Sequence, residues 1–542
     1  MIGLASPHND GVPSLIPGAE NPFTGQDVRS LLEACRQSWG GRPFLYWEPF
    51  EGEPSVFSFA EFVTRVERFA AGLHARGVRP GDRLLIHLEN CPEALISWLG
   101  CGVLGAVAVM TSPRAARAEM AWFVELTQPV ACVTQPKFQD LVAASAPELR
   151  WIAVTDTDCG AEPAGARPGR SDRFESLLGD PADIPARRSD PGLPFSIQFT
   201  SGTTARPKGV VWTHANALWG GRVGALHQAL TPDDVYLVTL PVNHTNAQSY
   251  SILSSLTVGA AVVLQPRFSA SRFWSASLAR GCTVTSVVPF CVQALLDQPI
   301  AERHAYRLWG NAVCSPPADA RLGVRTIGWW GMSETVTHGT VGHPTETNTP
   351  MSIGRASPAY RLKVLTPDGH EAGVDEPGEL HIQGVRGVSL FAGYLNDPAA
   401  TEASFDRDGY LATGDRVRRD ANGFYFFCDR AKDILKVGGE NVSAAEIEGV
   451  ILSVAGVREA AVVGRPHPML DEVPVAFVVA AGLEPPGLEG RIASACASAL
   501  SDFKRPREIR LTTSLPRATL EKVAKAELRA LLVREAGSPT TS

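Results

Sequence analysis

Residues 199–210 read FTSGTTARPKGV and combine four hydroxyl side chains, two glycines and a lysine. Apolar residues precede and follow this stretch, so we expect a loop between two short strands. Glycine permits close backbone approach, hydroxyl groups donate neutral hydrogen bonds, and Lys208 supplies positive charge. The stretch therefore predicts a phosphate cradle at a sheet edge. It is not a Walker loop, because Pro207 precedes the lysine and Gly209 follows it.

Length and composition limit the classes of protein to consider. The chain has 542 residues, with 50 basic and 57 acidic residues and a net charge of -7. This length exceeds what one hydrophobic core usually serves, so a large domain plus a smaller one is expected. No basic block suits a nucleic-acid backbone, and nucleic acid is not an expected partner. The ten cysteines form no CxxC pair, which favours reduced thiols in the cytoplasm over zinc sites or disulfides.

No export or membrane segment is expected. The N-terminal residues lack a basic segment followed by an apolar core, so there is no sign of a secretory signal. The uncharged run at 94–110 is short for a membrane span and contains three glycines. We predict a buried helix, a glycine turn and a core strand there.

Helix and strand patterns alternate through the first part of the chain. Ser58 and Glu61 form a predicted capping box, after which apolar residues recur at helical spacing until Gly77. Strands are predicted at 84–88, 131–134, 260–264 and 283–288. This alternation predicts an α/β fold with largely parallel sheets. The Gly-, Pro-, Asp- and Arg-rich residues 158–190 are expected to form a surface excursion.

A domain boundary is expected near residue 429. Short aromatic strands at 423–428 give way there to a charged segment and then to Val437, Gly438 and Gly439. Beyond it we predict helices at 444–452 and 492–500 and strands at 460–463 and 475–479. A module of roughly 110 residues is within the usual domain range. The chain is therefore divided into an N-terminal domain, residues 1–429, and a small α+β C-terminal domain, residues 430–542.

Further segments accompany the loop in a fixed order. They are LPVNHTNAQ at 240–248, GWWGMSET at 328–335, YLATGD at 410–415, DRAKDILKVGGEN at 429–441 and LPRATLEK at 515–522. With the loop, they resemble the ordered motifs of the adenylate-forming superfamily, which includes acyl-CoA and aryl-CoA ligases, peptide-synthetase adenylation domains and luciferases. The resemblance covers residues 58–532 and is greatest to carnitine/crotonobetaine:CoA ligase-like enzymes. It implies a large α/β domain, a small mobile domain and a reaction in the cleft between them.

The resemblance implies a nucleotide site. The expected ATP contacts are Thr200, Ser201, Gly202, Thr203, Thr204, Lys208, Trp330, Gly331, Met332, Ser333, Thr335, Asp415, Arg430 and Lys522. Trp330 would offer adenine a ring face, and Asp415 and Arg430 would contact the ribose. Glu334 and Thr200 would hold Mg²⁺ through hard oxygen atoms.

The resemblance also implies the catalytic and acid-binding residues. Lys522 corresponds to the catalytic lysine, and Lys432 to the hinge between the domains. His244 borders the carboxylate pocket, together with Asn246, Trp329 and His338, and the expected catalytic set is Lys522, Glu334, Thr200 and His244. Gly438 and Gly439 would line the pantetheine path of CoA.

The implied function is ATP-dependent activation of a carboxylic acid as an acyl-adenylate, with release of pyrophosphate, followed by transfer to the CoA thiol. ATP, Mg²⁺ and CoA are the implied cofactors, and the polar, bulky pocket residues favour a small, medium-sized or aromatic acid over a long fatty acid. The sequence does not set the oligomeric state, and a homodimer stays open.

Alternatives rest on two departures from the family pattern. Glu521 replaces the usual glycine before Lys522, and residues 311–314 read NAVC in place of a Gly-Ala-Pro turn. Drift within the branch is one explanation of both departures, and a change of acceptor or acid is the other. The adenylate can instead pass to an amine, as in an amide ligase, or the acid can be nitrite, as in a diazotase acting on an arylamine. A degenerate nucleotide-binding protein is disfavoured, because Lys208, Glu334, Asp415, Arg430 and Lys522 are all retained.

Overall fold

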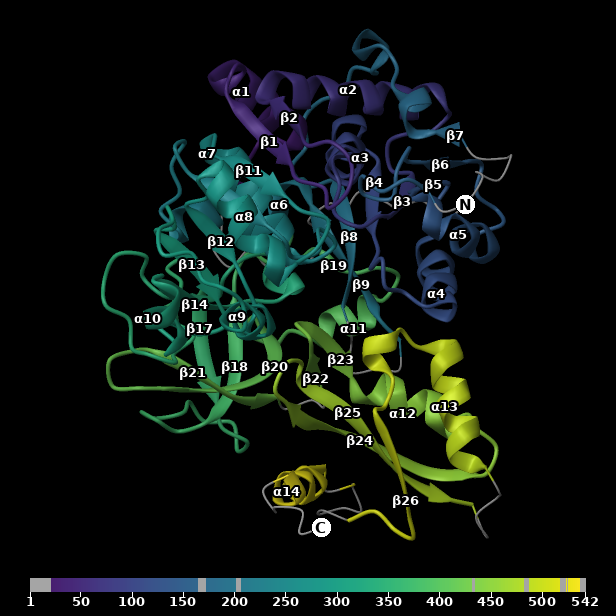
Figure 1. Cartoon of the computed structure of the whole chain (residues 1–542), viewed down its shortest axis with the longest axis vertical. Helices are drawn as coiled ribbons and strands as arrows, with labels where there is room; N and C mark the ends of the chain where they lie inside the picture. Colours follow the sequence, from purple (N-terminus) through teal and green to yellow (C-terminus); the bar gives the residue numbers. More distant parts are fainter. Residues whose placement is uncertain are drawn as a thin grey trace.

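The computed structural model describes residues 21–163, 172–200, 206–430, 434–481, 487–516, 523 and 525–536. Figure 1 shows a large N-terminal domain, coloured purple to green, above a small C-terminal domain coloured light green to yellow. The mixed α/β fold class and the large-plus-small organisation predicted from the sequence are confirmed.

One large sheet has the strand order β16-β15-β14-β13-β12-β10-β11-β1-β2. The six neighbouring strands β14, β13, β12, β10, β11 and β1 pair in parallel. The outer strands β2, β15 and β16 pair antiparallel with their neighbours. The strands are β1 (Pro43–Trp47), β2 (Ser55–Ser58), β10 (Val235–Val238), β11 (Ala261–Leu264), β12 (Val284–Ser286), β13 (Leu308–Asn311), β14 (Thr326–Trp330), β15 (Thr340–Val341) and β16 (Arg355–Ala356).

A second large sheet has the order β19-β9-β8-β4-β3-β5-β6-β7. The neighbouring strands β8, β4, β3, β5, β6 and β7 pair in parallel. Strand β9 pairs antiparallel with both β8 and β19. The strands are β3 (Arg83–His87), β4 (Val107–Met110), β5 (Ala131–Thr134), β6 (Ile152–Val154), β7 (Asp172–Arg173), β8 (Pro194–Thr200), β9 (Lys208–Thr213) and β19 (Gly393–Tyr394).

Helices fill the space between these sheets and cover their outer faces. They are α1 (Val28–Trp39), α2 (Phe59–Ala75), α3 (Pro92–Leu104), α4 (Arg117–Thr127), α5 (Gln139–Ser145), α6 (His214–His227), α7 (Ser254–Val258), α8 (Ala270–Arg280), α9 (Pro289–Leu296), α10 (Ala318–Leu322) and α11 (Pro398–Glu402). A π-helical segment, η4 (Asn246–Leu253), continues into α7. The capping box of Ser58 and Glu61 starts α2 as predicted.

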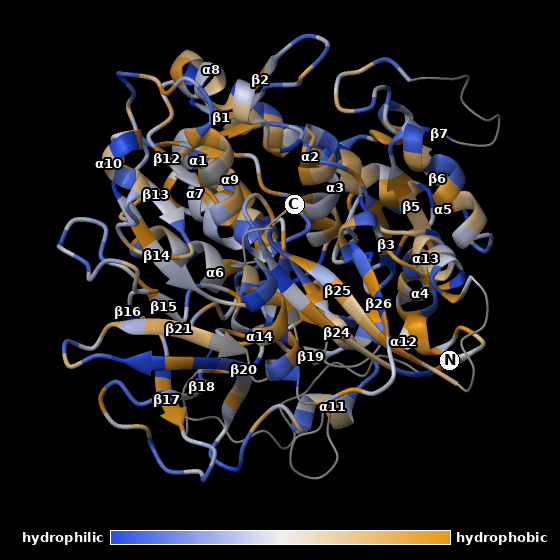
Figure 2. Ribbon diagram, turned by 60° about the horizontal axis from the view of Figure 1, so that its bottom comes forward, coloured by the Kyte–Doolittle hydropathy of each residue, from blue (hydrophilic) through white to orange (hydrophobic). Residues whose placement is uncertain are grey.

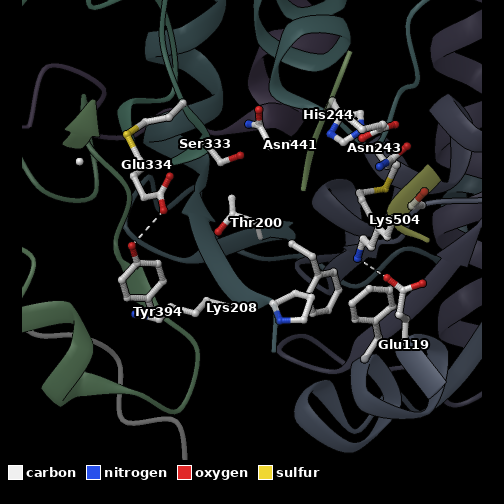
Figure 3. Close-up of a pocket in the computed structure, with 18 of the residues that line it drawn as sticks. Glu119, Thr200, Lys208, Asn243, His244, Ser333, Glu334, Tyr394, Asn441 and Lys504 are labelled. Carbon is white, nitrogen blue, oxygen red and sulfur yellow. Dashed lines mark hydrogen bonds and ion pairs between the residues drawn. The ribbon is translucent and has the colours of Figure 1, made fainter. Parts of the chain in front are cut away.

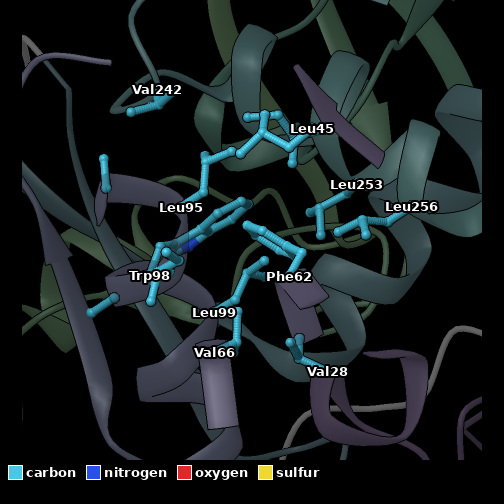
Figure 4. Packing of buried hydrophobic residues seen from close by; sticks show 14 of the residues in the cluster. Val28, Leu45, Phe62, Val66, Leu95, Trp98, Leu99, Val242, Leu253 and Leu256 are labelled. Carbon is cyan, nitrogen blue, oxygen red and sulfur yellow. The ribbon is translucent and has the colours of Figure 1, made fainter. Parts of the chain in front are cut away.

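One hydrophobic cluster contacts both large sheets. Trp98 and Leu95 of α3 lie beside Phe62 of α2, with Leu45 of β1 and Leu253 of η4 close by (Figure 4). All five side chains have at most 1 % of their surface exposed. Burying side chains of this size contributes about 1.5–3 kcal/mol each. The run at 94–110 is therefore a core element, with α3, a left-handed Gly105 (φ 86°) and β4 where a helix, a turn and a strand were predicted.

A third sheet, with the order β17-β18-β20-β21, is antiparallel and was not predicted from the sequence. Its strands are β17 (Arg361–Leu365), β18 (Gly378–Gln383), β20 (Tyr410–Arg419) and β21 (Tyr425–Arg430). The pairing of β18 with β20 is irregular, because Glu379 faces Arg416 whereas His381 faces Ala412. This bulge places Thr413, Gly414 and Asp415 beside the cavity described below.

The small domain is a sheet with helices on both faces. Its strands follow the order β23-β22-β25-β24, and β26 pairs with β25. Ile447 of α12 and Ile492 of α13 pack on one face, and Leu528 of α14 packs on the other. In Figure 2 these strands lie in front of the large domain. The elements are β22 (Ile434–Val437), β23 (Glu440–Ser443), α12 (Ala444–Leu452), β24 (Val457–His467), β25 (Asp471–Ala480), α13 (Leu488–Ala499), β26 (Glu508–Thr512) and α14 (Lys525–Ala536).

No helix within the described ranges is long and apolar enough to cross a membrane. All ten cysteines lie in these ranges as free thiols, and only Cys428 among them is exposed.

Candidate active site

A cavity of about 460 Å³ lies between the two domains. Large-domain residues from the ends of β8 and β9, from the loop before η4, from η5 (Ser333–Thr335) and from β20 form most of its wall. Small-domain residues from the turn between β22 and β23 and from η6 (Asp502–Lys504) complete it. Figure 3 shows side chains from both domains pointing into this space. The cavity thus requires the small domain in its present position.

The ends of the phosphate loop are fixed by α4. Thr200 of β8 pairs with Lys208 of β9, and both residues line the cavity. Trp122 Nε1 of α4 donates a hydrogen bond to the Pro207 carbonyl at 2.9 Å, and the Phe123 ring lies 4.0 Å from that of Phe199. The predicted strands on either side of the loop are therefore present. Ser201, Gly202, Thr203 and Thr204 lie outside the described residues.

Glu334 lies opposite the lysine of the loop. The Tyr394 hydroxyl of β19 donates to Glu334 Oε1 at 2.9 Å (Figure 3), and Lys208 Nζ is 4.4 Å from the centre of the Tyr394 ring. Glu334 is 3 % exposed, so its carboxylate lies in a largely water-excluded part of the cavity. Burial and the neighbouring Glu334 carboxylate raise the pKa of Tyr394, which keeps the phenol protonated as a donor. The sequence analysis did not identify Tyr394.

The residues around Glu334 have different roles. Met332 and Ser333 also line the cavity. The Ser333 hydroxyl accepts a hydrogen bond from Thr245 Oγ1 at 3.1 Å, and Trp212 Nε1 donates to the Ser333 carbonyl at 2.8 Å. Thr335 is fully buried and its hydroxyl accepts from the Met332 amide at 2.9 Å, so it shapes the η5 turn. Gly331 and Thr335 are not among the cavity-lining residues of the described chain.

Asp415 reaches the cavity from the bulge in β20. It is 5 % exposed and accepts a hydrogen bond from Trp330 Nε1 at 2.7 Å. Gly414 has a left-handed φ of 73°, and its amide donates to Glu379 Oε1 at 3.0 Å, which holds the bulge. Arg430 is paired with Asp415 across the backbone of β20 and β21.

The part of the cavity around His244 contains an ion pair between the domains. His244 Nε2 lies 3.0 Å from Glu440 Oε2, and both residues line the cavity. Burial lowers the pKa of His244, but the Glu440 carboxylate outweighs it and raises this pKa above its ordinary value. Burial raises the pKa of Glu440, but the nearby His244 lowers it by more, so the pKa of Glu440 lies below its ordinary value. His244 therefore favours the protonated form while the small domain is docked.

A second interdomain contact is a buried cluster of three charges. Lys504 Nζ of η6 contacts Glu119 of α4 and lies 3.0 Å from Glu446 Oε1 of α12. The three side chains are 6–8 % exposed. Burial lowers the pKa of Lys504, but the two carboxylates raise it overall. Arg114 adds a contact with the Phe503 ring at 4.3 Å. The sequence analysis did not identify any member of this cluster.

The paired glycines lie in the turn between β22 and β23. Gly438 and Gly439 both have positive φ, 58° and 85°. Gly439 lines the cavity, and a Cβ atom at this position would lie 3.1 Å from Val288 of the large domain. A side chain at Gly439 would therefore be both strained and tightly packed.

Two of the other predicted acid-pocket residues, Trp329 and His338, pack together with Tyr250 and His227. Trp329 stacks on His338 with ring centres 4.5 Å apart, and Tyr250 of η4 lies 3.9 Å from His338. His338 Nδ1 lies 3.1 Å from Nδ1 of His227, and burial lowers the pKa of both imidazoles. Trp329, His338 and Asn246 are not among the cavity-lining residues of the described chain. Trp329, His338 and Tyr250 thus pack against one another and do not line the described cavity.

Several predicted residues fall outside the described ranges. These are Ser201, Gly202, Thr203, Thr204, Lys432, Glu521 and Lys522, and the side chain of Arg430 is likewise not described. Their roles stay predictions.

The sequence profile of AMP-binding enzymes matches residues 32–395, and that of the AMP-binding enzyme C-terminal domain matches residues 446–522. Crotonobetaine/carnitine–CoA ligase from Escherichia coli is 32 % identical over 521 residues, covering 93 % of this chain and 99 % of the relative.

Two solved structures of o-succinylbenzoate CoA synthetase from Bacillus subtilis are also similar, each 26 % identical and covering 93 % of this chain and 98 % of the other. The TM-score is 0.80 for a double mutant bound to a CoA product analogue and 0.65 for a complex with AMP.

Proposed function

Because this chain belongs to the family of AMP-binding enzymes, we propose that it is an ATP-dependent, AMP-forming acid–CoA ligase. The single observation that carries this proposal is the composition of one cavity wall. Thr200, Lys208, Glu334 and Asp415 supply groups suited to a nucleotide, and Gly439 of the small domain faces the same space. Such a wall can serve both the activation of an acid and its transfer to a thiol.

In the first half-reaction an acid oxygen attacks the α-phosphorus of ATP, and pyrophosphate leaves. Lys208 and the loop hydroxyls would hold the leaving phosphates, and Asp415 the ribose. Lys522, the predicted catalytic lysine, would offset the charge that builds up between the two anions. These roles follow from the family resemblance and the placement of the described residues.

The residues that line the cavity fit Mg²⁺. Glu334 and Thr200 offer a carboxylate and a hydroxyl oxygen to the same space, which are ligands that Mg²⁺ prefers. Among the described residues there is no cluster of three or more metal-binding side chains, as expected for an ion held by one carboxylate plus phosphates and water. The bound ion would neutralise phosphate charge. Tyr394, by donating to Glu334 Oε1, would orient the carboxylate toward the ion.

The docked small domain supports the second half-reaction. The TM-score to the synthetase bound to a CoA product analogue is higher than that to its AMP complex at equal identity, which supports a domain arrangement like that of the CoA complex. In this arrangement Gly439 leaves room at the cavity for a pantetheine arm, and the His244–Glu440 pair closes the acid side. The thiol would attack the adenylate carbonyl, forming the thioester and releasing AMP.

The acid is proposed to be compact. Trp329 lies against Gly310, where a Cβ atom would come within 1.5 Å of the indole ring, and Trp329 stacks in turn on His338. We take this close packing to leave little room for a long acyl chain. A short carboxylic acid, or a small aromatic one admitted by side-chain movement, fits this wall better than a long fatty acid.

The test is a panel of short, aromatic and long acids, assayed for acid-dependent pyrophosphate exchange and for AMP release with CoA. Short or aromatic acids should support exchange, and a CoA thioester should form. Lys522→Ala should lower exchange at least ~100-fold, as expected for loss of one preorganised charged donor. AMP release that requires nitrite or an amine and never CoA would contradict the proposal. The relatives do not favour those acceptors.

We further propose a cytoplasmic location, supported by the ten free thiols. Measurement of the molecular mass in solution would decide whether the protein forms a homodimer.

A further inference from the structure

Trp330 was expected to present its ring face to adenine, but its contacts point elsewhere. The side chain is 7 % exposed and belongs to a hydrophobic cluster with Leu380, Ile382 and Leu411 of the third sheet. It is not among the cavity-lining residues of the described chain, whereas its hydrogen-bond partner Asp415 is. Trp330 therefore meets the nucleotide site mainly through Asp415.

Both ends of the indole ring are held. The benzo edge lies over Gly339, where a Cβ atom would be 2.7 Å from Cζ3 of the ring, so only glycine leaves it room. The backbone of Trp330 is paired with Thr340 of β15. The pyrrole end points to β20, where Nε1 donates to Asp415 Oδ2 at 2.7 Å. This N–H thus has a fixed direction, set by packing on one side and by pairing on the other.

Asp415 needs such a contact because its own backbone is irregular. It sits in the β20 bulge after the left-handed Gly414, and its amide donates to Thr413 Oγ1 at 3.2 Å. A carboxylate has about four lone-pair sites, and the bond from the indole occupies one of them. Hydrogen bonds to a charged acceptor in a buried place are strong and directional. A carboxylate held by Trp330 is therefore oriented before the nucleotide arrives.

We infer that Trp330 is a positioning residue that holds Asp415 for the ribose hydroxyls, and that its indole N–H contributes more to nucleotide recognition than its ring face. The inference rests on the proposed function, because it takes the cavity to bind an adenine nucleotide. The enzyme should then distinguish AMP from 2′,3′-dideoxy-AMP through Trp330 as well as through Asp415. A tyrosine or phenylalanine at this position would supply a ring face but no N–H to Asp415.

The experiment is a double-mutant cycle measured by nucleotide binding, so the carboxylic acid substrate does not have to be known. Calorimetry measures the Kd of AMP and of 2′,3′-dideoxy-AMP for the full-length wild type, W330F, D415A and the double variant W330F/D415A. In W330F the affinity for AMP should fall about tenfold, as for loss of a hydrogen bond to a charged group, and that for the dideoxy analogue by about twofold or less. In D415A, which has no acceptor for the indole N–H, adding W330F should leave the ratio of the two affinities unchanged.

A ring-preserving variant separates the N–H from the indole shape. Replacement of Trp330 by benzothienylalanine keeps the bicyclic ring and removes only the N–H, so it should reproduce the loss of ribose selectivity without a cavity in the core. W309F is the matched control, because Trp309 is another buried tryptophan whose N–H meets no acceptor among the described residues. W309F should keep the wild-type ratio.

The outcomes are distinct. Equal weakening of AMP and the dideoxy analogue by both Trp330 variants would show that the ring face dominates and would overturn the inference. Equal binding of the two nucleotides by the wild type would also overturn it, with the proposed function intact. A wild type that binds no adenine nucleotide and catalyses no pyrophosphate exchange would overturn the proposed function itself.

Discussion

At the scale of single residues, the site depends on pairs in which one side chain orients another. Tyr394 donates to Glu334, and His244 pairs with Glu440. The sequence predicted Glu334 and His244, because each lies in a motif of fixed spacing. It did not predict their partners, because Tyr394 and Glu440 lie 60 and 196 positions away and no local pattern encodes such a contact. The sequence thus predicted these two cavity-lining residues but not the side chains that contact them.

Tyr394→Phe should test the orientation of Glu334. Loss of a hydrogen bond to a buried carboxylate should lower acid-dependent pyrophosphate exchange about tenfold and raise the Mg²⁺ concentration needed for half-maximal rate. Exchange measured across a Mg²⁺ titration gives both values. Tyr410→Phe is the control, because Tyr410 is not among the cavity-lining residues of the described chain. An unchanged Mg²⁺ requirement in Y394F would argue against this role.

At the scale of elements, α4 connects the phosphate loop with the small domain. Trp122 and Phe123 fix the two ends of the loop, and Glu119 on the same helix contacts Lys504. Glu119 Oε2 also accepts from the Ala116 amide at 2.8 Å, so one carboxylate caps the helix and binds the other domain. The sequence predicted the strands beside the loop but not this helix contact. Burial of three charges depends on tertiary packing, which a linear pattern does not contain.

Lys504→Met should separate the two half-reactions. It leaves Glu119 and Glu446 buried without their cation, which typically costs about 3–5 kcal/mol in an intact buried network. The docked arrangement should therefore be disfavoured, so that thioester formation falls at least tenfold while pyrophosphate exchange stays within about twofold of wild type.

Single-turnover thioester formation from preformed adenylate measures the second step. Arg507→Met is the control, because Arg507 pairs only with Asp502 on the surface of the same domain among its described contacts. The triple variant E119Q/K504M/E446Q should recover part of the lost rate, since neutral partners carry no unpaired charge. An equal loss of both half-reactions in K504M would rule out this role for the cluster.

At the scale of the whole molecule, the α/β class and the large-plus-small organisation were predictable from alternating patterns and motif order. The antiparallel third sheet was not predicted. The sequence indicated only the aromatic strands near 423–428, and the pairing of β18 with the ten-residue β20 contains a bulge that no periodic pattern encodes. The position of the small domain relative to the large one was also not predictable from the sequence. It depends on contacts such as His244–Glu440, which form only when the domains meet.

The docked fraction should depend on pH. The pKa of His244 is raised on docking, so its contribution is complete below the ordinary histidine value, about 6.5, and is lost as pH rises through the raised value. The pKa of Glu440 is lowered, so its contribution disappears as pH falls through that lowered value. Docking should therefore be favoured between these two values. Because His244 is 39 % exposed, the effect should be at most about fivefold.

Energy transfer between one dye on each domain measures the docked fraction from pH 5 to pH 9. The wild type should lose docking toward pH 9, and His244→Gln should show a flatter profile. An identical profile in both proteins would assign the pH dependence to other groups.

The cavity shared by both domains has a consequence for the order of events in turnover. Since the phosphate-loop ends and the glycine turn of the small domain border the same 460 Å³, the departing and arriving substrates compete for one volume. Pyrophosphate must then leave before the thiol substrate is seated, and AMP must leave before a new nucleotide enters. We therefore expect ping-pong steady-state kinetics, in which double-reciprocal plots for ATP at different CoA concentrations are parallel.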